Sequence, residues 1–354
     1  MITRRSFLKR SAQAALASTW LSPRSPAAEA RGIKSRPDVV IYRGTYPGWP
    51  WIARSADGTL WCVFREGTVH DFSAEGKALW TKSTDGGKSW SMAQTIVDEP
   101  GVDDRNVAIT VLPKEELLVV YNTYTAQRES LAMTVRSGDG GATWSKPQPV
   151  GEPNTRTRSA AVALADGSLI LPYYVAPGSG ALAARSIDGG RSWTTVRVPD
   201  ADGFVGDEWD VLEVKPDHLV GVFRNSHPRQ DGTFWIAASK DRGKTWSPPR
   251  PSNVQSKRHA SPAQIVRQGK SPTLIFADRR MVSVSAARTK DPELLKWDLD
   301  LSCYRYNEGE EPIADGSYPA SAPIDARTRL IVDYEIRSDA KQIAGYFVTF
   351  PEDW

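Results

Sequence analysis

Cysteine is scarce in this sequence, and its scarcity excludes a fold held together by disulfides. Cys62 and Cys303 are the only two cysteines in 354 residues, and two cysteines cannot build a framework of several bridges. Both lie in apolar, strand-like runs, so we expect buried thiols. Histidine, cysteine and carboxylate residues nowhere occur at the spacing of metal ligands, and no metal or other cofactor is expected.

Long hydrophobic runs are also missing, which bears on both membranes and helices. The apolar run from Ala12 to Leu21 is too short to cross a bilayer, so no membrane span is expected. No long apolar stretch follows the 3.6-residue helical period, whereas 13 tryptophans, 27 glycines and 25 prolines punctuate the chain. This composition favours an all-β protein.

The first thirty residues resemble an export signal rather than part of a folded domain. The sequence MITRRSFLKR places paired arginines before Phe-Leu-Lys, and a short apolar run then leads to AEA at residues 28–30. This pattern is typical of a twin-arginine signal peptide; an amphipathic first helix is the alternative. We therefore expect residues 1–30 to be a signal peptide, residues 31–354 to form one domain, and the protein to be periplasmic or secreted.

Removal of residues 1–30 would change the formal charge from +3 to −1, because this segment carries five basic side chains and one acidic side chain. A nearly neutral domain argues against nucleic acid or an anionic membrane as the main partner.

One eight-residue box recurs along the chain. STDGGKSW ends at Trp90, and related copies end at Trp144, Trp193 and Trp246, with steps of 54, 49 and 53 residues. A weaker copy, TKDPELLKW, ends at Trp297. A period near fifty residues indicates one supersecondary unit used repeatedly.

A second repeat lies between the boxes and consists of two strand-like runs joined by a tight turn. Six such hairpins begin at Trp49, Arg105, Thr157, Glu208, Ser261 and Tyr318. They predict an all-β, six-bladed β-propeller of four-stranded antiparallel blades. We expect the segment DVVIY at residues 38–42 to supply the last strand of the final blade and close the ring.

The boxes themselves are expected to be structural turns. Each has one essential aspartate, too few for a calcium loop, and the glycine spacing does not fit a phosphate loop. Asp85 can accept backbone N–H groups, Gly86 and Gly87 allow left-handed dihedral angles, and Trp90 can pack over the turn.

The propeller geometry selects candidate functional residues on one rim. In an antiparallel hairpin, the start of the first strand and the end of the second lie at the same edge. Arginines, carboxylates and tyrosines around one cavity would suit an anionic sugar. The rim candidates at strand starts are Gly48, Trp49, Arg105, Arg156, Arg158, Glu208, His259 and Tyr318; those at strand ends are Arg65, Glu66, His70, Asp71, Tyr124, Tyr173, Tyr174, Arg224, Arg279, Arg280 and Tyr334.

The boxes match the Asp-box (BNR) repeat, and the hairpins resemble the sialidase (neuraminidase) superfamily over nearly all of residues 31–354. EWDVLEVKPDHLVGVFRN resembles the sialidase stretch that carries a glutamate and an arginine, here Glu208 and Arg224. FADRRMVSVSAARTKD resembles the stretch that carries another arginine, here Arg280. DGSYPASAPIDARTRLIVDYE resembles the segment of the nucleophilic tyrosine, here Tyr318.

This resemblance implies a retaining exo-glycosidase with a tyrosine nucleophile. A sialic acid carries its carboxylate on the anomeric carbon, and a neutral tyrosine avoids the repulsion that a carboxylate nucleophile would meet. Glu208 would deprotonate Tyr318, and Arg224 and Arg280 would bind the substrate carboxylate. The acid for the leaving oxygen would be Asp71.

Two positions depart from the sialidase pattern. The first strand of a sialidase opens with Arg-Ile-Pro, whereas YPGWPWIA places Gly48 where that arginine should stand. Arg43, Arg54 or Arg105 could substitute from another direction, and Arg65 and Arg105 are expected to bind substrate from the rim. His70, beside Asp71, is a second candidate for the acid, because an imidazole titrates near neutral pH.

The sequence therefore predicts an exported, monomeric, sialidase-like glycoside hydrolase that acts on a glycan or glycoconjugate with an acidic sugar. Two alternatives remain open on the same fold. One is a polysaccharide lyase or another exo-glycosidase of uronic-acid glycans, in which arginines neutralise a uronate carboxylate. The other is a propeller that binds glycans without cleaving them.

Overall fold

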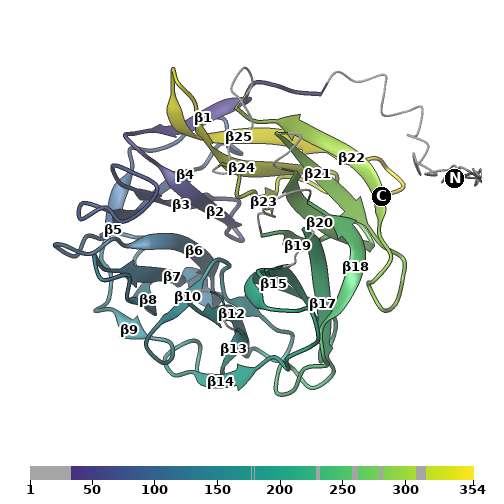
Figure 1. Cartoon of the computed structure of the whole chain (residues 1–354). Helices are drawn as coiled ribbons and strands as arrows, with labels where there is room; N and C mark the ends of the chain where they lie inside the picture. Colours follow the sequence, from purple (N-terminus) through teal and green to yellow (C-terminus); the bar gives the residue numbers. More distant parts are fainter. Residues whose placement is uncertain are drawn as a thin grey trace, which may run out of the picture. The chain divides into compact units, whose positions relative to one another are not determined.

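Nearly every regular element of the chain is a β-strand, and the strands form six antiparallel sheets. The computed structural model describes residues 33–354 except 177, 179, 229–231, 257–261, 279–281 and 308–315. Within this part, the sheets are arranged as the blades of a ring (Figure 1). The prediction of a six-bladed propeller with four-stranded blades is confirmed. The predicted signal peptide lies outside the described residues and stays a prediction.

Each blade is built from strands that are consecutive in the chain, with one exception in blade 6. Blade 1 contains β2 (Gly48–Arg54), β3 (Leu60–Glu66), β4 (Lys77–Ser83) and β5 (Gln94–Val97); blade 2 contains β6 (Arg105–Val111), β7 (Leu117–Tyr124), β8 (Ser130–Ser137) and β9 (Gln148–Pro149); blade 3 contains β10 (Thr155–Thr157), β11 (Val162–Ala163), β12 (Leu169–Val175), β13 (Ala181–Ser186) and β14 (Thr194–Arg197). Blade 4 contains β15 (Gly206–Lys215), β16 (His218–Asn225), β17 (Thr233–Ser239) and β18 (Arg250–Gln255); blade 5 contains β19 (Gln264–Gln268), β20 (Ser271–Asp278), β21 (Ser283–Arg288) and β22 (Asp298–Arg305); blade 6 contains β23 (Ala320–Pro323), β24 (Thr328–Ile336), β25 (Lys341–Thr349) and β1 (Val39–Arg43). A short 3-10 turn, Pro113–Glu115, connects β6 and β7.

The second strands of the blades are apolar on both faces, because neighbouring blades cover both. In β3, LWCVFRE, six consecutive side chains are buried, and in β7 the first six are buried. The fourth strands face solvent; β9 is exposed throughout. Cys62 lies in β3, and both it and Cys303 are buried and unpaired, as the sequence predicts. No helix within the described ranges is long and apolar enough to cross a membrane.

The ring is closed by a strand from the beginning of the described chain. β1 pairs antiparallel with β25, with Val39 opposite Gly345 and Arg43 opposite Gln342. β1 is therefore the outermost strand of blade 6, whose other three strands come from the C-terminal end (Figure 1). This confirms the prediction made from DVVIY.

The Asp boxes are turns between the third and fourth strands, as expected. The Asp85 carboxylate accepts hydrogen bonds from the backbone N–H groups of Lys88 and Ser89, both at 3.0 Å, and from the Ser89 hydroxyl at 2.6 Å. Gly86 and Gly87 have φ angles of 76° and 91°. The Trp90 indole N–H donates to the Gly87 carbonyl at 3.1 Å, so the aspartate and the tryptophan of the box both form their hydrogen bonds inside the turn.

Candidate active site

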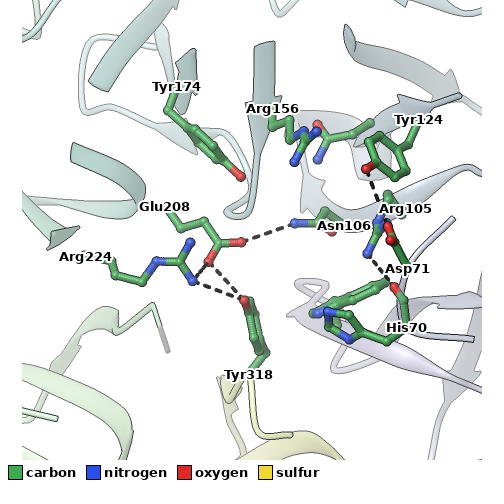
Figure 2. A pocket seen from close by; sticks show the side chains of 12 residues that line it. His70, Asp71, Arg105, Asn106, Tyr124, Arg156, Tyr174, Glu208, Arg224 and Tyr318 are labelled. Atoms are coloured by element: carbon green, nitrogen blue, oxygen red, sulfur yellow. Dashed lines mark hydrogen bonds and ion pairs between the residues drawn. The ribbon is translucent and has the colours of Figure 1, made fainter. Parts of the chain in front are cut away.

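A pocket of about 220 Å³ opens at the rim that the hairpin geometry selects. Its residues come from the starts of first strands, the ends of second strands and the loop after β3 (Figure 2). The lining residues are Trp49, His70, Asp71, Arg105, Asn106, Asn122, Tyr124, Arg156, Tyr174, Glu208, Arg224 and Tyr318.

Bulges at the starts of three inner strands turn side chains toward this pocket. The register of strand pairing changes between Gly48 and Trp51 in β2, between Arg105 and Ala108 in β6, and between Gly206 and Trp209 in β15. An extra residue in one strand of a pair changes the direction of the side chains around it. The bulges lie at the segments that contribute Trp49, Arg105 and Glu208 to the pocket.

Tyr318 and Glu208 lie together, although they are 110 residues apart in the chain. The Tyr318 hydroxyl donates to Glu208 Oε2 at 3.1 Å, and both residues are buried, with 7% and 4% of their surfaces exposed. Arg224 Nη1 lies 2.5 Å from Glu208 Oε2 and 3.3 Å from the Tyr318 hydroxyl (Figure 2). The arrangement joins a phenol, a carboxylate that can accept its proton, and a positive charge that can stabilise a phenolate.

The backbone of Tyr318 is held at both of its polar groups. Its N–H donates to Asp333 Oδ1 at 2.7 Å, and its carbonyl accepts from Arg158 Nη2 at 2.9 Å. The Arg158 guanidinium also lies 5.2 Å from the centre of the Tyr318 ring. Burial lowers the pKa of Arg158 and raises the pKa of Asp333 to about 6. These contacts fix the ring beside Glu208.

Arg224 is held by two carboxylates. Its Nε donates to Asp207 at 2.9 Å and its Nη2 donates to the same carboxylate at 2.6 Å, while Nη1 faces Glu208. The pKa of Arg224 is raised well above its usual value, because the charges of Asp207 and Glu208 outweigh the effect of burial. Arg224 thus lines the pocket as predicted, with most of its donors used by the protein.

Arg105 and Arg156 form a second cationic group around Tyr124. Their guanidinium carbons lie 5.0 and 4.8 Å from the centre of the Tyr124 ring, and that of Arg105 lies 4.3 Å from the Trp49 ring. Arg105 was assigned to substrate binding from the sequence, whereas Arg156 was named only as a rim residue. The sequence feature that marked Arg156 was its position at the start of a first strand, and seven other rim candidates share this feature.

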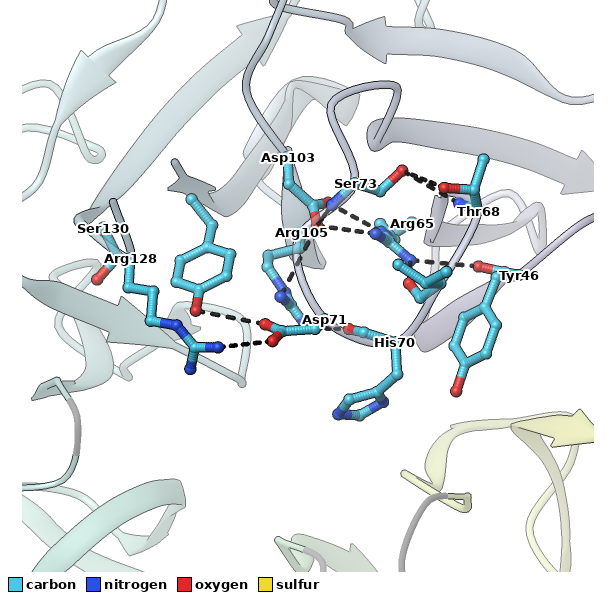
Figure 3. A network of polar contacts seen from close by, with 12 residues as sticks. Tyr46, Arg65, Thr68, His70, Asp71, Ser73, Asp103, Arg105, Arg128 and Ser130 are labelled. Carbon is cyan, nitrogen blue, oxygen red and sulfur yellow. Dashed lines mark hydrogen bonds and ion pairs between the residues drawn. The ribbon is translucent and has the colours of Figure 1, made fainter. Parts of the chain in front are cut away.

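Arg65 does not line the pocket, contrary to the expectation that it binds substrate. Its side chain is fully buried and forms two hydrogen bonds with Asp103, at 2.9 and 2.8 Å (Figure 3). A third donor contacts the Val69 carbonyl at 2.7 Å. Because all of these partners belong to the protein, Arg65 anchors the loop that carries His70.

His70 and Asp71 both reach the pocket from this loop. The His70 ring packs edge-on against Trp49, with 5.3 Å between ring centres. Asp71 forms an ion pair of 2.9 Å with Arg128 (Figure 3) and accepts a hydrogen bond of 3.5 Å from Tyr124 (Figure 2). The pocket therefore holds both candidates for the acid, and the Trp49 ring lies against both the His70 ring and the Tyr318 ring.

Two further expectations concern the arginines that would bind a substrate carboxylate, Arg280 and the arginine missing at Gly48. Arg280, assigned to the carboxylate clamp, lies outside the described residues. At Gly48, a Cβ atom would meet nothing within 4 Å, so the place of the missing arginine is open, and Trp49 with Arg105 against its ring stands beside it. Asn106, which donates to Glu208 at 3.4 Å and lies near the bulge of β6, was not anticipated from the sequence.

No three histidine, cysteine or carboxylate side chains gather as potential metal ligands in the part of the chain that the structure describes. The side chains that line the pocket supply a phenol, carboxylates, an imidazole and guanidinium groups.

Comparison with known proteins decides the family. The model of the BNR repeat-like domain matches residues 58–302, which is more than half of the chain. The chain belongs to the BNR repeat-like domain family. No curated protein matches.

Solved structures share the fold of this BNR-repeat protein at low sequence identity. A protein of unknown function from Dyadobacter fermentans is 19% identical, with a TM-score of 0.76; the match covers 90% of this chain and 100% of that one. A variant of the NanB sialidase from Streptococcus pneumoniae is 12% identical, with a TM-score of 0.70 and coverage of 92% and 72%. An intramolecular trans-sialidase from Ruminococcus gnavus, in complex with oseltamivir carboxylate, is 13% identical, with a TM-score of 0.67 and coverage of 92% and 98%. The protein is a sialidase-like BNR-repeat propeller.

Proposed function

We propose that this protein is an exo-acting, retaining glycoside hydrolase for an acidic sugar, with Tyr318 as the nucleophile. The observation that carries the proposal is the contact of the Tyr318 hydroxyl with Glu208 at 3.1 Å, next to Arg224 at 3.3 Å. A phenol becomes a competent nucleophile when a base beside it takes its proton and a cation stabilises the phenolate.

The reaction would proceed in two displacements. In the first, Tyr318 Oη attacks the anomeric carbon, its proton passes to Glu208, and the bond from that carbon to the leaving oxygen breaks. The leaving oxygen takes a proton from Asp71, with His70 as the alternative donor. In the second, a water attacks the same carbon and gives its proton to the group that acted as acid, the bond from that carbon to Tyr318 Oη breaks, and Tyr318 regains its proton from Glu208. The configuration is retained because two inversions occur.

The size of the pocket supports action on a chain end. Its volume of about 220 Å³ is below the roughly 300–1,000 Å³ of pockets that enclose drug-sized ligands. Such a pocket suits a single terminal sugar, and the rest of the glycan would extend into solvent.

The Tyr318→Phe variant tests the nucleophile. We expect cleavage of fluorogenic glycosides of acidic sugars to be lost, whereas the thermal midpoint should change little, since the Glu208–Arg224 contact remains. Tyr42→Phe, which alters the outer strand β1, is the matched control and should keep its activity. Wild-type turnover in Tyr318→Phe would refute the assignment.

A uronate lyase is the second candidate, and the exposed His70 in the pocket favours it. An imidazole there could remove the proton next to a uronate carboxylate while a guanidinium neutralises the charge. The product separates the two reactions, because a lyase yields an unsaturated uronate that absorbs ultraviolet light and a hydrolase does not. Binding of glycans on an array without any product would instead support a non-catalytic propeller.

Export through residues 1–30 and a monomeric state are part of the same proposal. Expression with Arg4 and Arg5 both replaced by lysine should leave the protein in the cytoplasm, if the segment is a twin-arginine signal.

Size-exclusion chromatography with light scattering would give the mass in solution, and a value near 39.0 kDa for the full chain is expected.

A further inference from the structure

Charge is distributed unevenly around the pocket. Beside Tyr318, the guanidinium groups of Arg224 and Arg158 face three carboxylates, those of Asp207, Glu208 and Asp333. Among the residues that the structure describes, this side therefore carries no excess of positive charge to attract a substrate carboxylate.

The other side of the pocket carries an excess of positive charge. Asp103 is hydrogen-bonded to Arg65 and lies 3.7 Å from Arg105, so that one carboxylate faces two guanidinium groups. Arg156 adds a third guanidinium group, and Asp71, the other carboxylate beside Tyr124, is paired with Arg128. Burial lowers the pKa of Arg105, and the charges of Arg65 and Arg156 lower it further, against the opposite effect of Asp103. A bound anion would relieve this repulsion.

Arg156 has donors that the protein does not use. Its Nε donates to the Ser130 hydroxyl at 3.1 Å, and its two terminal nitrogens have no hydrogen-bond partner within the residues described. Figure 2 shows these nitrogens directed into the pocket, on the side opposite Tyr318. Arg156 belongs to blade 3 and Tyr318 to blade 6, which are opposite blades in a ring of six.

We propose that Arg105 and Arg156 bind the carboxylate of the substrate, and that the substrate is a terminal hexuronic acid. If Tyr318 attacks the anomeric carbon, as in the proposed function on which this inference rests, the carboxylate must lie at the far end of the sugar ring. A hexuronic acid has this geometry, because its carboxylate is attached to C5. A sialic acid does not, because its carboxylate is attached to the anomeric carbon itself.

The surroundings of Tyr318 agree with this assignment. A carboxylate on the anomeric carbon would approach Glu208 and Asp207, and among the described residues the charges of Arg224 and Arg158 are already balanced there, with no further arginine at Gly48. A tyrosine nucleophile also suits a hexuronic acid, because an aspartate or glutamate nucleophile at position 318 would place a third carboxylate next to Asp207 and Glu208.

Binding measured without turnover tests the inference. In the Tyr318→Phe background, isothermal titration should detect free glucuronate or galacturonate more strongly than glucose or N-acetylneuraminate. Arg156→Met should weaken hexuronate binding by roughly 10- to 100-fold, the usual worth of a hydrogen bond to a charged group, and should leave glucose binding unchanged. Arg250→Met, which removes an exposed arginine paired with Glu293, is the matched control and should behave as the parent.

The outcomes separate this inference from the proposed function. Hexuronate binding that depends on Arg156, with no cleavage of any hexuronide, would support the inference and refute the hydrolase. Cleavage of a sialoside that needs Tyr318 but is unchanged in Arg156→Met would support the hydrolase and overturn the inference. Equal binding of hexuronate in the Arg156→Met and parent proteins would also overturn it.

Discussion

Buried carboxylates bond to backbone N–H groups of other blades or loops, one of them at the pocket. Asp333 accepts the N–H of Tyr318, and Asp210 Oδ2 accepts the N–H of Ile265 at 3.0 Å and so connects blades 4 and 5. Burial raises the pKa of Asp210 to about 7, although its hydrogen bonds and the charge of Arg158 act in the opposite direction. An aspartate in the unfolded chain has a pKa near 3.9. At pH values between these two pKa values, the folded protein therefore keeps a proton at Asp210 that the unfolded chain releases.

This difference predicts how stability depends on pH. Between pH values of about 4 and 7, the folded state holds more protons than the unfolded state, so the contribution of Asp210 to stability is lost as pH rises through this window. In Asp210→Asn this loss should vanish, and the difference in unfolding free energy between wild type and variant should change by up to about 1.4 kcal/mol per pH unit. Urea unfolding at several pH values measures it.

Asp98→Asn, at an exposed site, is the control and should track wild type across the same range. Parallel pH profiles for wild type and Asp210→Asn would show that Asp210 ionises in the folded protein as it does in the unfolded chain.

At the scale of elements, the Asp boxes and the strand bulges have different origins. A box is complete within eight residues: the Thr143 hydroxyl and backbone and the Ser137 hydroxyl bond to Asp139, lowering its pKa to about 2. Local hydrogen bonds of this kind are visible in a sequence, because all partners are close in the chain. The bulge that turns Glu208 into the pocket depends on how β15 pairs with β16. The spacing of the boxes does not predict this register.

The tryptophan of a box is expected to stabilise the fold rather than the site. Trp90 is partly buried, packs against the core and donates to the Gly87 carbonyl. Trp90→Ala should lower the unfolding free energy by about 2–3 kcal/mol, less than for a fully buried tryptophan, with no change in substrate preference. Met92→Ala, at a side chain that is 88% exposed, should be neutral. A Trp90→Ala variant as stable as wild type would contradict the structural role of the box.

At the scale of the whole molecule, the pocket exists only in the closed ring. Its residues come from blades 1, 2, 3, 4 and 6, and β1 completes blade 6 by pairing with β25. Without β1, the polar backbone groups of β25 would form an open sheet edge, which promotes aggregation.

Two truncations test ring closure. A chain that begins at Ile33 keeps β1 and should show the thermal midpoint of the longer chain, whereas one that begins at Gly44 lacks β1 and should unfold at a markedly lower temperature or aggregate. Differential scanning calorimetry with light scattering distinguishes these results. Equal midpoints for the two truncations would mean that β1 does not stabilise the ring.

The repeat spacing by itself determined the number of blades, the closing strand and the rim, because turns and hairpins form from neighbouring residues. It also placed Tyr318 and Glu208 among the rim candidates at the starts of inner strands, from which the resemblance to sialidases selected them. Only the tertiary structure decided which arginines face the pocket. Arg65 and Arg224 are held by Asp103 and Asp207, whereas Arg156 keeps donors for a ligand. These pairings join residues distant in the chain, so their geometry depends on how the blades pack around the axis.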